Sequence, residues 1–91
     1  MTLLEKRFGR AVREARMDHG WSQERLAEAA DLNRSYLGEI ERGQVTASLV
    51  TADKLASALH LRLSVLVSRC EQAASARTSK SPVRRLGGDS L

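Results

Sequence analysis

Residues 22–43 read SQERLAEAADLNRSYLGEIERG, and this stretch predicts two short helices joined by a tight turn. Ser22 is a favourable N-cap for the first helix, because its side chain can accept a bond from a free backbone N–H. Asn33 can cap the second helix in the same way, and Gly43 is a natural residue for its end. Asp31 tolerates the turn conformation that the connection requires. We expect the remaining helices to pack around this pair.

The second helix of the pair has two different faces. Leu37 and Ile40 share one side and are expected to point into the core. The opposite face is formed by Arg34, Ser35, Gly38, Glu39 and Arg42. A polar helix held by a preceding helix across a tight turn is the layout of a helix-turn-helix, in which the second helix enters a DNA groove.

Glu41 is an exception on this helix, because its position lies beside Leu37 and Ile40 on the inner side. A carboxylate that is partly buried needs a partner. Arg16 lies on the edge of the apolar stripe of the first helix in the chain and is also turned inward. We therefore predict an ion pair between Arg16 and Glu41 that links the first and third helices. The alternative is that each side chain reaches solvent separately.

Apolar residues recur at helical spacing on both sides of the central pair. A first helix is predicted over residues 4–18, a fourth ending at Leu59 and a fifth beginning near Leu63, with Ser48 or Thr46 as the cap of the fourth. The expected core stripes are Leu4, Phe8, Ala11, Val12 and Ala15 in the first helix, Leu49, Ala52, Leu55, Ala56 and Leu59 in the fourth, and Leu63, Leu66, Val67, Cys70 and Ala74 in the fifth. The fold class is therefore predicted to be all-α with five helices.

The apolar stripe of the fifth helix continues further than a four-helix core needs. Leu61, Val65 and Val67 are therefore candidates for a dimer interface, and Val65 in particular points away from the stripe and is expected to be exposed. The alternative is that the surplus residues pack against the core of their own domain.

The charge of the chain is unevenly distributed. The 91 residues carry a net charge of +4, but residues 75–91 hold four basic side chains against one acid. This segment is rich in Ser, Arg and Gly, so we expect a disordered basic tail after a single domain at residues 1–74. The tail is either an inert extension or a non-specific DNA contact. Because the domain itself is nearly neutral, DNA binding must depend on where its charges point.

Several classes of function find no support in the sequence. The chain has no apolar run long enough to span a membrane, and its first residues lack the apolar segment of a signal peptide. A single cysteine, Cys70, cannot form an internal disulfide, which favours a cytoplasmic protein. His19, His60 and Cys70 lack metal-ligand spacing, and no catalytic constellation or phosphate-binding glycine loop is present. We therefore expect no enzyme, cofactor or metal.

Residues 8–67 together resemble the Xre family of bacterial and phage helix-turn-helix proteins, which includes the lambda-type repressors and Cro. The matching residues are Ser22-Gln23-Glu24, Leu26-Ala27, Tyr36-Leu37, Ile40-Glu41-Arg42-Gly43, Ser48-Leu49, Leu55-Ala56 and Ala58-Leu59. The resemblance implies a lambda-repressor-like domain that binds a partly palindromic operator as a homodimer. It also implies the pairing of Arg16 with Glu41. The chain departs from the family pattern at three positions. Asp31 stands where a turn glycine is common, and His60 stands where glycine or asparagine is common. Arg62 stands where a Ser or Thr cap is frequent.

The resemblance also implies roles for the polar residues of the central stretch. Arg34, Ser35 and Glu39 would read bases, Gln23 would bond a phosphate, and Arg42 and Gln44 would contact the DNA backbone. The chemistry of these side chains agrees, because an arginine can bond O6 and N7 of one guanine and a glutamate can accept from the cytosine amino group. Gly38 would let the helix sit close to DNA, and Tyr36 would bond a phosphate or pack against the turn.

Two functions of different classes follow. The leading hypothesis is a sequence-specific transcriptional regulator that binds an operator in double-stranded DNA as a homodimer, with its own concentration or a protein partner as the means of regulation. The alternative is a protein-interaction module, such as an antitoxin or an anti-activator, that uses the same fold to bind a protein. For the outward face of the third helix, the alternative reading is an inert solvated surface.

Overall fold

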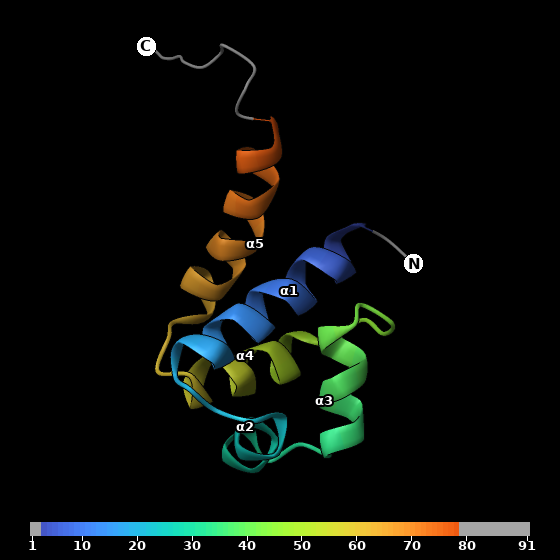
Figure 1. Ribbon diagram of the computed structural model, residues 1–91, viewed down its shortest axis with the longest axis vertical. Helices are drawn as coiled ribbons and strands as arrows, with labels where there is room; N and C mark the ends of the chain where they lie inside the picture. The colour runs from blue at the N-terminus through green and yellow to red at the C-terminus, as the bar shows by residue number, and fades with distance from the viewer. Residues whose placement is uncertain (1–2, 79–91) are drawn as a thin grey trace.

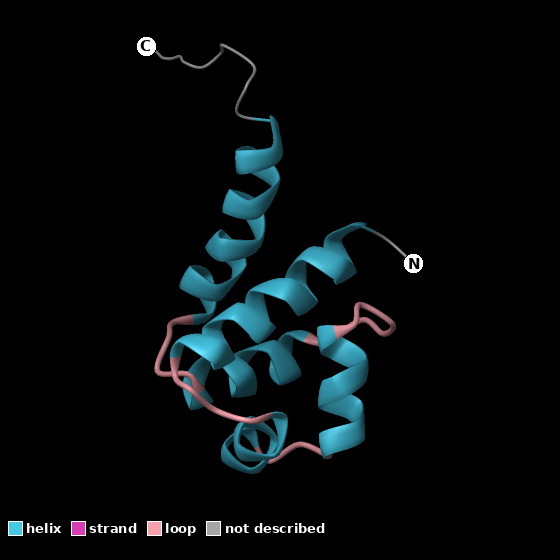
Figure 2. Ribbon diagram, in the orientation of Figure 1, coloured by secondary structure: helices cyan, strands magenta, loops and turns pink. Residues whose placement is uncertain are grey.

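The computed structural model describes residues 3–78, and the side chains as far as residue 72. Within this part the chain forms five helices and no strand (Figures 1 and 2). They are α1 (Leu3–Asp18), α2 (Gln23–Ala30), α3 (Arg34–Glu41), α4 (Leu49–Ala58) and α5 (Leu63–Thr78). The predicted all-α, five-helix fold class is therefore confirmed, and none of the described helices is long and apolar enough to cross a membrane.

The helix starts follow from the side chains that the sequence places there. The Ser22 hydroxyl oxygen accepts a bond from the backbone N–H of Arg25 at 3.1 Å. The Asn33 side chain accepts from the N–H of Ser35 at 2.8 Å, and the Ser48 hydroxyl caps α4. Each cap satisfies a backbone donor that has no partner inside the helix, so these three starting points are fixed locally.

Two turn residues other than glycine adopt the left-handed backbone region. Asp31 ends α2 with a φ of 57°, and His60 follows α4 with a φ of 60°. A Cβ is unfavourable in this region, so glycine is the usual residue at such turns and asparagine or aspartate is tolerated. Asp31 and His60 therefore carry a small conformational cost and leave the turns intact.

The core is formed where the helices meet. Its largest fully buried side chains are Leu26, Leu37, Ile40, Leu55, Leu59, Leu66, Val12 and Cys70. Helix α1 lies against both α3 and α5, and the C-terminal half of α5 projects beyond the other four helices (Figure 1). Helix α5 also continues through residues 75–78, which the sequence reading assigned to the tail, whereas residues 79–91 lie outside the described residues.

Three residues predicted for the core stripes are exposed. Leu4 is 59 % exposed and Leu49 is 76 % exposed, because each lies in the first turn of its helix. Side chains on a helix tilt toward its N-terminus, so those of the first turn extend past the helix end. Val67 is 40 % exposed, because it faces a groove that its own domain does not fill. Val65 is also 40 % exposed, as expected.

A close contact between backbones fixes the position of α3 against α1. A Cβ on Gly9 would lie 2.3 Å from the Ile40 carbonyl oxygen and 2.7 Å from the Glu41 carbonyl oxygen. Only glycine permits this approach, because any other residue would force the two helices apart. The end of α3 is therefore held directly on the surface of α1.

Candidate nucleic-acid interface

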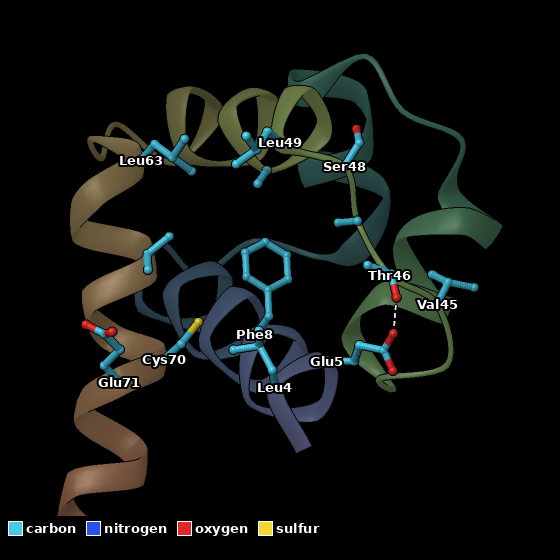
Figure 3. A pocket seen from close by; sticks show the side chains of 13 residues that line it. Leu4, Glu5, Phe8, Val45, Thr46, Ser48, Leu49, Leu63, Cys70 and Glu71 are labelled. Atoms are coloured by element: carbon cyan, nitrogen blue, oxygen red, sulfur yellow. Dashed lines mark hydrogen bonds between the residues drawn. The ribbon is translucent and has the colours of Figure 1, made fainter. Parts of the chain in front are cut away.

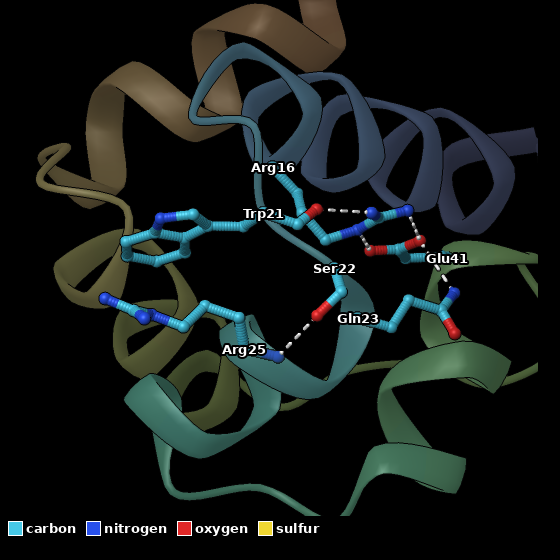
Figure 4. A network of polar contacts seen from close by, with 6 residues as sticks. All are labelled: Arg16, Trp21, Ser22, Gln23, Arg25 and Glu41. Atoms are coloured by element: carbon cyan, nitrogen blue, oxygen red, sulfur yellow. Dashed lines mark hydrogen bonds and ion pairs between the residues drawn. The ribbon is translucent and has the colours of Figure 1, made fainter.

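The inner side of α3 is fastened by a buried polar network (Figure 4). The Arg16 Nε donates to Glu41 Oε2 at 2.8 Å, and a second guanidinium nitrogen donates to Glu41 Oε1 at 3.0 Å. The remaining guanidinium nitrogen donates to the Trp21 carbonyl oxygen at 2.8 Å. The hydrogen bond with Glu41 raises the pKa of Arg16 despite the opposing effect of burial. The ion pair predicted from the facing of the two residues is thus present.

Gln23 joins this network from the start of α2. Its amide nitrogen donates to Glu41 Oε1 at 2.9 Å, so one carboxylate accepts bonds from both Arg16 and Gln23. An amide nitrogen carries two hydrogens, and this bond uses one of them. The Glu41 carboxylate therefore orients Gln23, the residue for which the resemblance implies a bond to a DNA phosphate.

The spacing predicts that Gly38 lies on the open face of α3, but the structure does not place it there. It is buried, and a Cβ at this position would lie 3.1 Å from an Arg42 guanidinium nitrogen and 3.7 Å from the Gln23 side-chain oxygen. The side chains of Arg42 and Gln23 lie over Gly38, because a glycine has no side chain and leaves room for them. Gly38 therefore makes space for Arg42 and Gln23, rather than presenting bare backbone to the solvent.

The remaining outward residues of α3 are polar and differ in exposure. Arg34 and Ser35 are exposed in its first turn, and Glu39 is half-buried one turn later. The Arg42 Nε donates to the Gln44 side-chain oxygen at 3.2 Å, so these two residues lie together after the helix. Tyr36 is partly buried and packs against the core cluster. Its ring is thus placed against the domain, in agreement with one of the two roles considered for it.

The three candidates for a dimer interface do not share one surface. Leu61 packs partly against the core. Val65 and Val67 are two positions apart on α5, which places them about 160° apart around the helix axis. Val67 lines a groove together with Leu4 and Leu49, whereas Val65 does not.

This groove, bounded by α1, α4, α5 and the loop before α4, was not foreseen from the sequence (Figure 3). Its apolar lining includes Leu4, Phe8, Leu49, Leu63, Val67 and Cys70. At one edge the Thr46 hydroxyl donates to the Glu5 carboxylate. The only sequence signal for it was the surplus length of the α5 stripe, because the exposure of Leu4 and Leu49 depends on how the helix ends are placed.

A second cluster that sequence reasoning missed surrounds Trp21. The His19 ring is stacked on the indole with 4.8 Å between ring centroids, and the Arg25 guanidinium lies 5.1 Å from the indole centroid. His19 Nε2 is also 2.9 Å from the Leu59 carbonyl oxygen. The cluster therefore connects the turn before α2 to the end of α4, and supports the helix on which Gln23 lies.

The comparison with known proteins agrees with this geometry. A family model described as Helix-turn-helix matches residues 12–66. The chain belongs to this family, the Xre-like helix-turn-helix family of transcriptional regulators. Enzymatic activity is not a property of this family, as the sequence predicts.

Named relatives come from several bacteria. The chain is 38% identical over 71 residues to the control protein C.BamHI of Bacillus amyloliquefaciens, covering 71% of this chain and 88% of that protein. It is 32% identical over 68 residues to the HTH-type transcriptional regulator SutR of Escherichia coli, covering 75% of this chain. The match spans only 38% of the length of SutR. Among solved structures, the restriction-modification controller protein C.AhdI of Aeromonas hydrophila is 47% identical with a TM-score of 0.67, over 68% of this chain and 94% of that one.

Proposed function

We propose that this chain is a sequence-specific transcriptional regulator that binds a partly palindromic operator as a homodimer, with α3 in the major groove. The observation that supports this function most directly is the division of α3 into two sides. Glu41 fastens one side to Arg16, which leaves Arg34, Ser35 and Glu39 on the other. An α-helix fits the major groove, where each base pair presents its own pattern of donors and acceptors.

In this arrangement Arg34 bonds a guanine and Glu39 accepts from a cytosine. Gln23, Arg42 and Gln44 contact phosphates on either side and set the register without reading sequence. The described domain is nearly neutral, with 11 basic and 10 acidic side chains in residues 3–72. Non-specific attraction to phosphates is therefore weak, and binding depends on the few residues that reach base edges.

The test is a selection of binding sites from a random DNA pool, followed by gel shifts on the selected site and on random DNA. The wild-type protein should enrich one sequence, and Arg34→Ala should lose roughly 1–3 kcal/mol of discrimination at one base pair. An exposed residue outside this face, as in Lys54→Ala, serves as the control. The regulator proposal fails if the wild-type protein enriches no sequence at moderate salt.

For the homodimer we propose the Val67 side of α5, together with Leu49, as the contact between two copies. Both side chains are exposed apolar groups on the groove between α1, α4 and α5, and their burial removes apolar area from water. Val65 supplies a matched control, because it has the same 40 % exposure but lies on another side of α5. Val67→Glu should give a monomer by light scattering, whereas Val65→Glu should leave the dimer. The opposite result would move the interface to the Val65 side.

A protein-interaction module remains the second candidate function, and the same groove favours it. A protein partner in place of a second copy would also cover Leu4, Leu49 and Val67. The two candidates differ in their requirement for α3. Arg34→Ala weakens the preference of a regulator for its operator over other DNA but leaves binding to a protein partner unchanged, so one variant distinguishes them.

A further inference from the structure

Helix α2 and the first turn of α3 enclose a shallow groove on the side where DNA is proposed to bind. Its lining consists of Glu24, Ala27, Glu28, Leu32 and Arg34. The two carboxylates and the guanidinium are all exposed side chains. Among the described side chains, none holds Arg34 in an ion pair, so its guanidinium can move between this groove and a DNA base.

Glu28 is unfavourable for the helix that carries it. It follows Glu24 by four positions, where like charges on neighbouring turns repel each other. It also lies in the last turn of α2, where the helix dipole disfavours a negative charge, and no basic residue is present in that turn. Arg25 lies three positions before Glu28, where an opposite charge could offset the repulsion. Its guanidinium instead lies over the Trp21 indole, 5.1 Å from the ring centroid, and none of the ion pairs among the described side chains joins it to Glu28. Helix stability therefore gives little reason for a carboxylate at this position.

We propose that Glu28, assisted by Glu24, is a positioning residue that orients the Arg34 guanidinium for a guanine and keeps it from DNA phosphates. This inference rests on the proposed function. A guanidinium has five N–H donors in one plane, of which two suffice for the O6 and N7 atoms of a guanine. The donors on its other edge are then available to a carboxylate, which fixes the plane of the group.

The same carboxylates discriminate against random DNA. A phosphate that approaches Arg34 also approaches Glu28, and the repulsion opposes a contact that carries no sequence information. A guanine edge is uncharged, so it accepts the same guanidinium without this penalty. Glu28 thus sets specificity by lowering non-specific affinity and by preorganising the specific contact.

The experiment compares Glu28→Gln with the wild-type protein on three DNAs: the selected site, the same site with the base pair read by Arg34 changed, and random DNA. Glutamine preserves the length and shape of the side chain and removes its charge. Glu14→Gln, an exposed acid on α1, is the matched control. We expect Glu28→Gln to bind random DNA about threefold more tightly at low salt, the effect of one charge on counterion release. The preference for guanine should fall by about tenfold, within the range of one bidentate contact.

The stability of each variant separates positioning from a structural role. Removing the repulsion with Glu24 should leave the urea midpoint of Glu28→Gln equal to or slightly above that of the wild type. A wild-type protein that enriches no sequence overturns the regulator proposal and this inference with it. Wild-type enrichment combined with an unchanged guanine preference in Glu28→Gln overturns this inference alone, as does an equal loss of preference in Glu14→Gln.

Discussion

Replacing Glu41 by alanine tests the attachment of α3 to the domain. The Glu41 side chain is 2 % exposed and that of Arg16 is 12 % exposed, so the substitution leaves a guanidinium nearly out of contact with water and without its carboxylate. Breaking a buried pair by removing one partner costs about 3–5 kcal/mol. Because Arg16 keeps its bond to the Trp21 carbonyl oxygen and some contact with solvent, we expect a loss of about 3 kcal/mol.

This loss is a large fraction of the stability of a small domain, which is about 5–10 kcal/mol for a chain of this length. The midpoint of thermal unfolding should fall by about 12–24 °C, at about 4–8 °C for each kcal/mol. Urea unfolding, followed by circular dichroism of the helices, gives the free energy of unfolding directly. The slope against urea should stay constant if the folded state keeps its surface.

Two further variants show whether burial is the cause. Asp18→Ala removes the exposed pair with Arg69, in which the side chains are 67 % and 35 % exposed, and should cost less than about 1 kcal/mol. Combining Arg16→Met with Glu41→Leu removes both buried charges and should recover most of the loss. If Glu41→Ala lies within about 1 kcal/mol of the wild type, the pair is effectively solvated and other contacts hold α3.

Three further predictions concern the packing and the turns. Gly9→Ala should lower the free energy of unfolding in urea by at least about 1–3 kcal/mol, because a Cβ 2.3 Å from the Ile40 carbonyl oxygen forces α1 from α3. His60→Gly should raise the free energy of unfolding in urea by about 1 kcal/mol, because glycine adopts a φ of 60° without the cost that a Cβ brings; an unchanged free energy would indicate that the ring contact with His19 compensates. Burial raises the pKa of the Cys70 thiol, although Arg7 opposes the shift, so a thiol reagent should label native protein far more slowly than protein in urea. The unfolded thiol ionises at lower pH than the folded one, so the stability from Cys70 is complete below the ordinary thiol pKa and decreases as the pH rises above it.

The parts of this fold that the sequence predicts are those that depend on local rules. Caps such as Ser22 and Asn33 act on backbone groups two or three residues away, so their effect is contained in the sequence around them. The Arg16–Glu41 pair was also predictable, because helical periodicity places both charges toward the core and a buried charge requires a partner.

The features that escaped prediction depend on how the helices are placed in three dimensions. Leu49 lies on the same side of α4 as the buried residues, as the periodicity predicts. It is nevertheless exposed, because it lies in the first turn of α4, which no other element covers. Gly38 lies at an outward angle, yet the side chains of Arg42 and Gln23 fold over it. Such coverage depends on long side chains from neighbouring segments, and the spacing of one helix contains no information about them.

The attachment of α3 connects the stability of the domain to its proposed reading of DNA. A helix of eight residues is too short to be stable alone, so its orientation comes from the Asn33 cap, the contact at Gly9 and the Glu41 pair. A bidentate contact with a base requires the guanidinium of Arg34 to be placed within a fraction of an ångström, whereas attraction to phosphates tolerates displacement. Loosening α3 should therefore reduce specific binding before it reduces non-specific binding. In a nearly neutral domain little non-specific affinity remains to compensate, so the buried pair behind α3 matters to recognition as well as to folding.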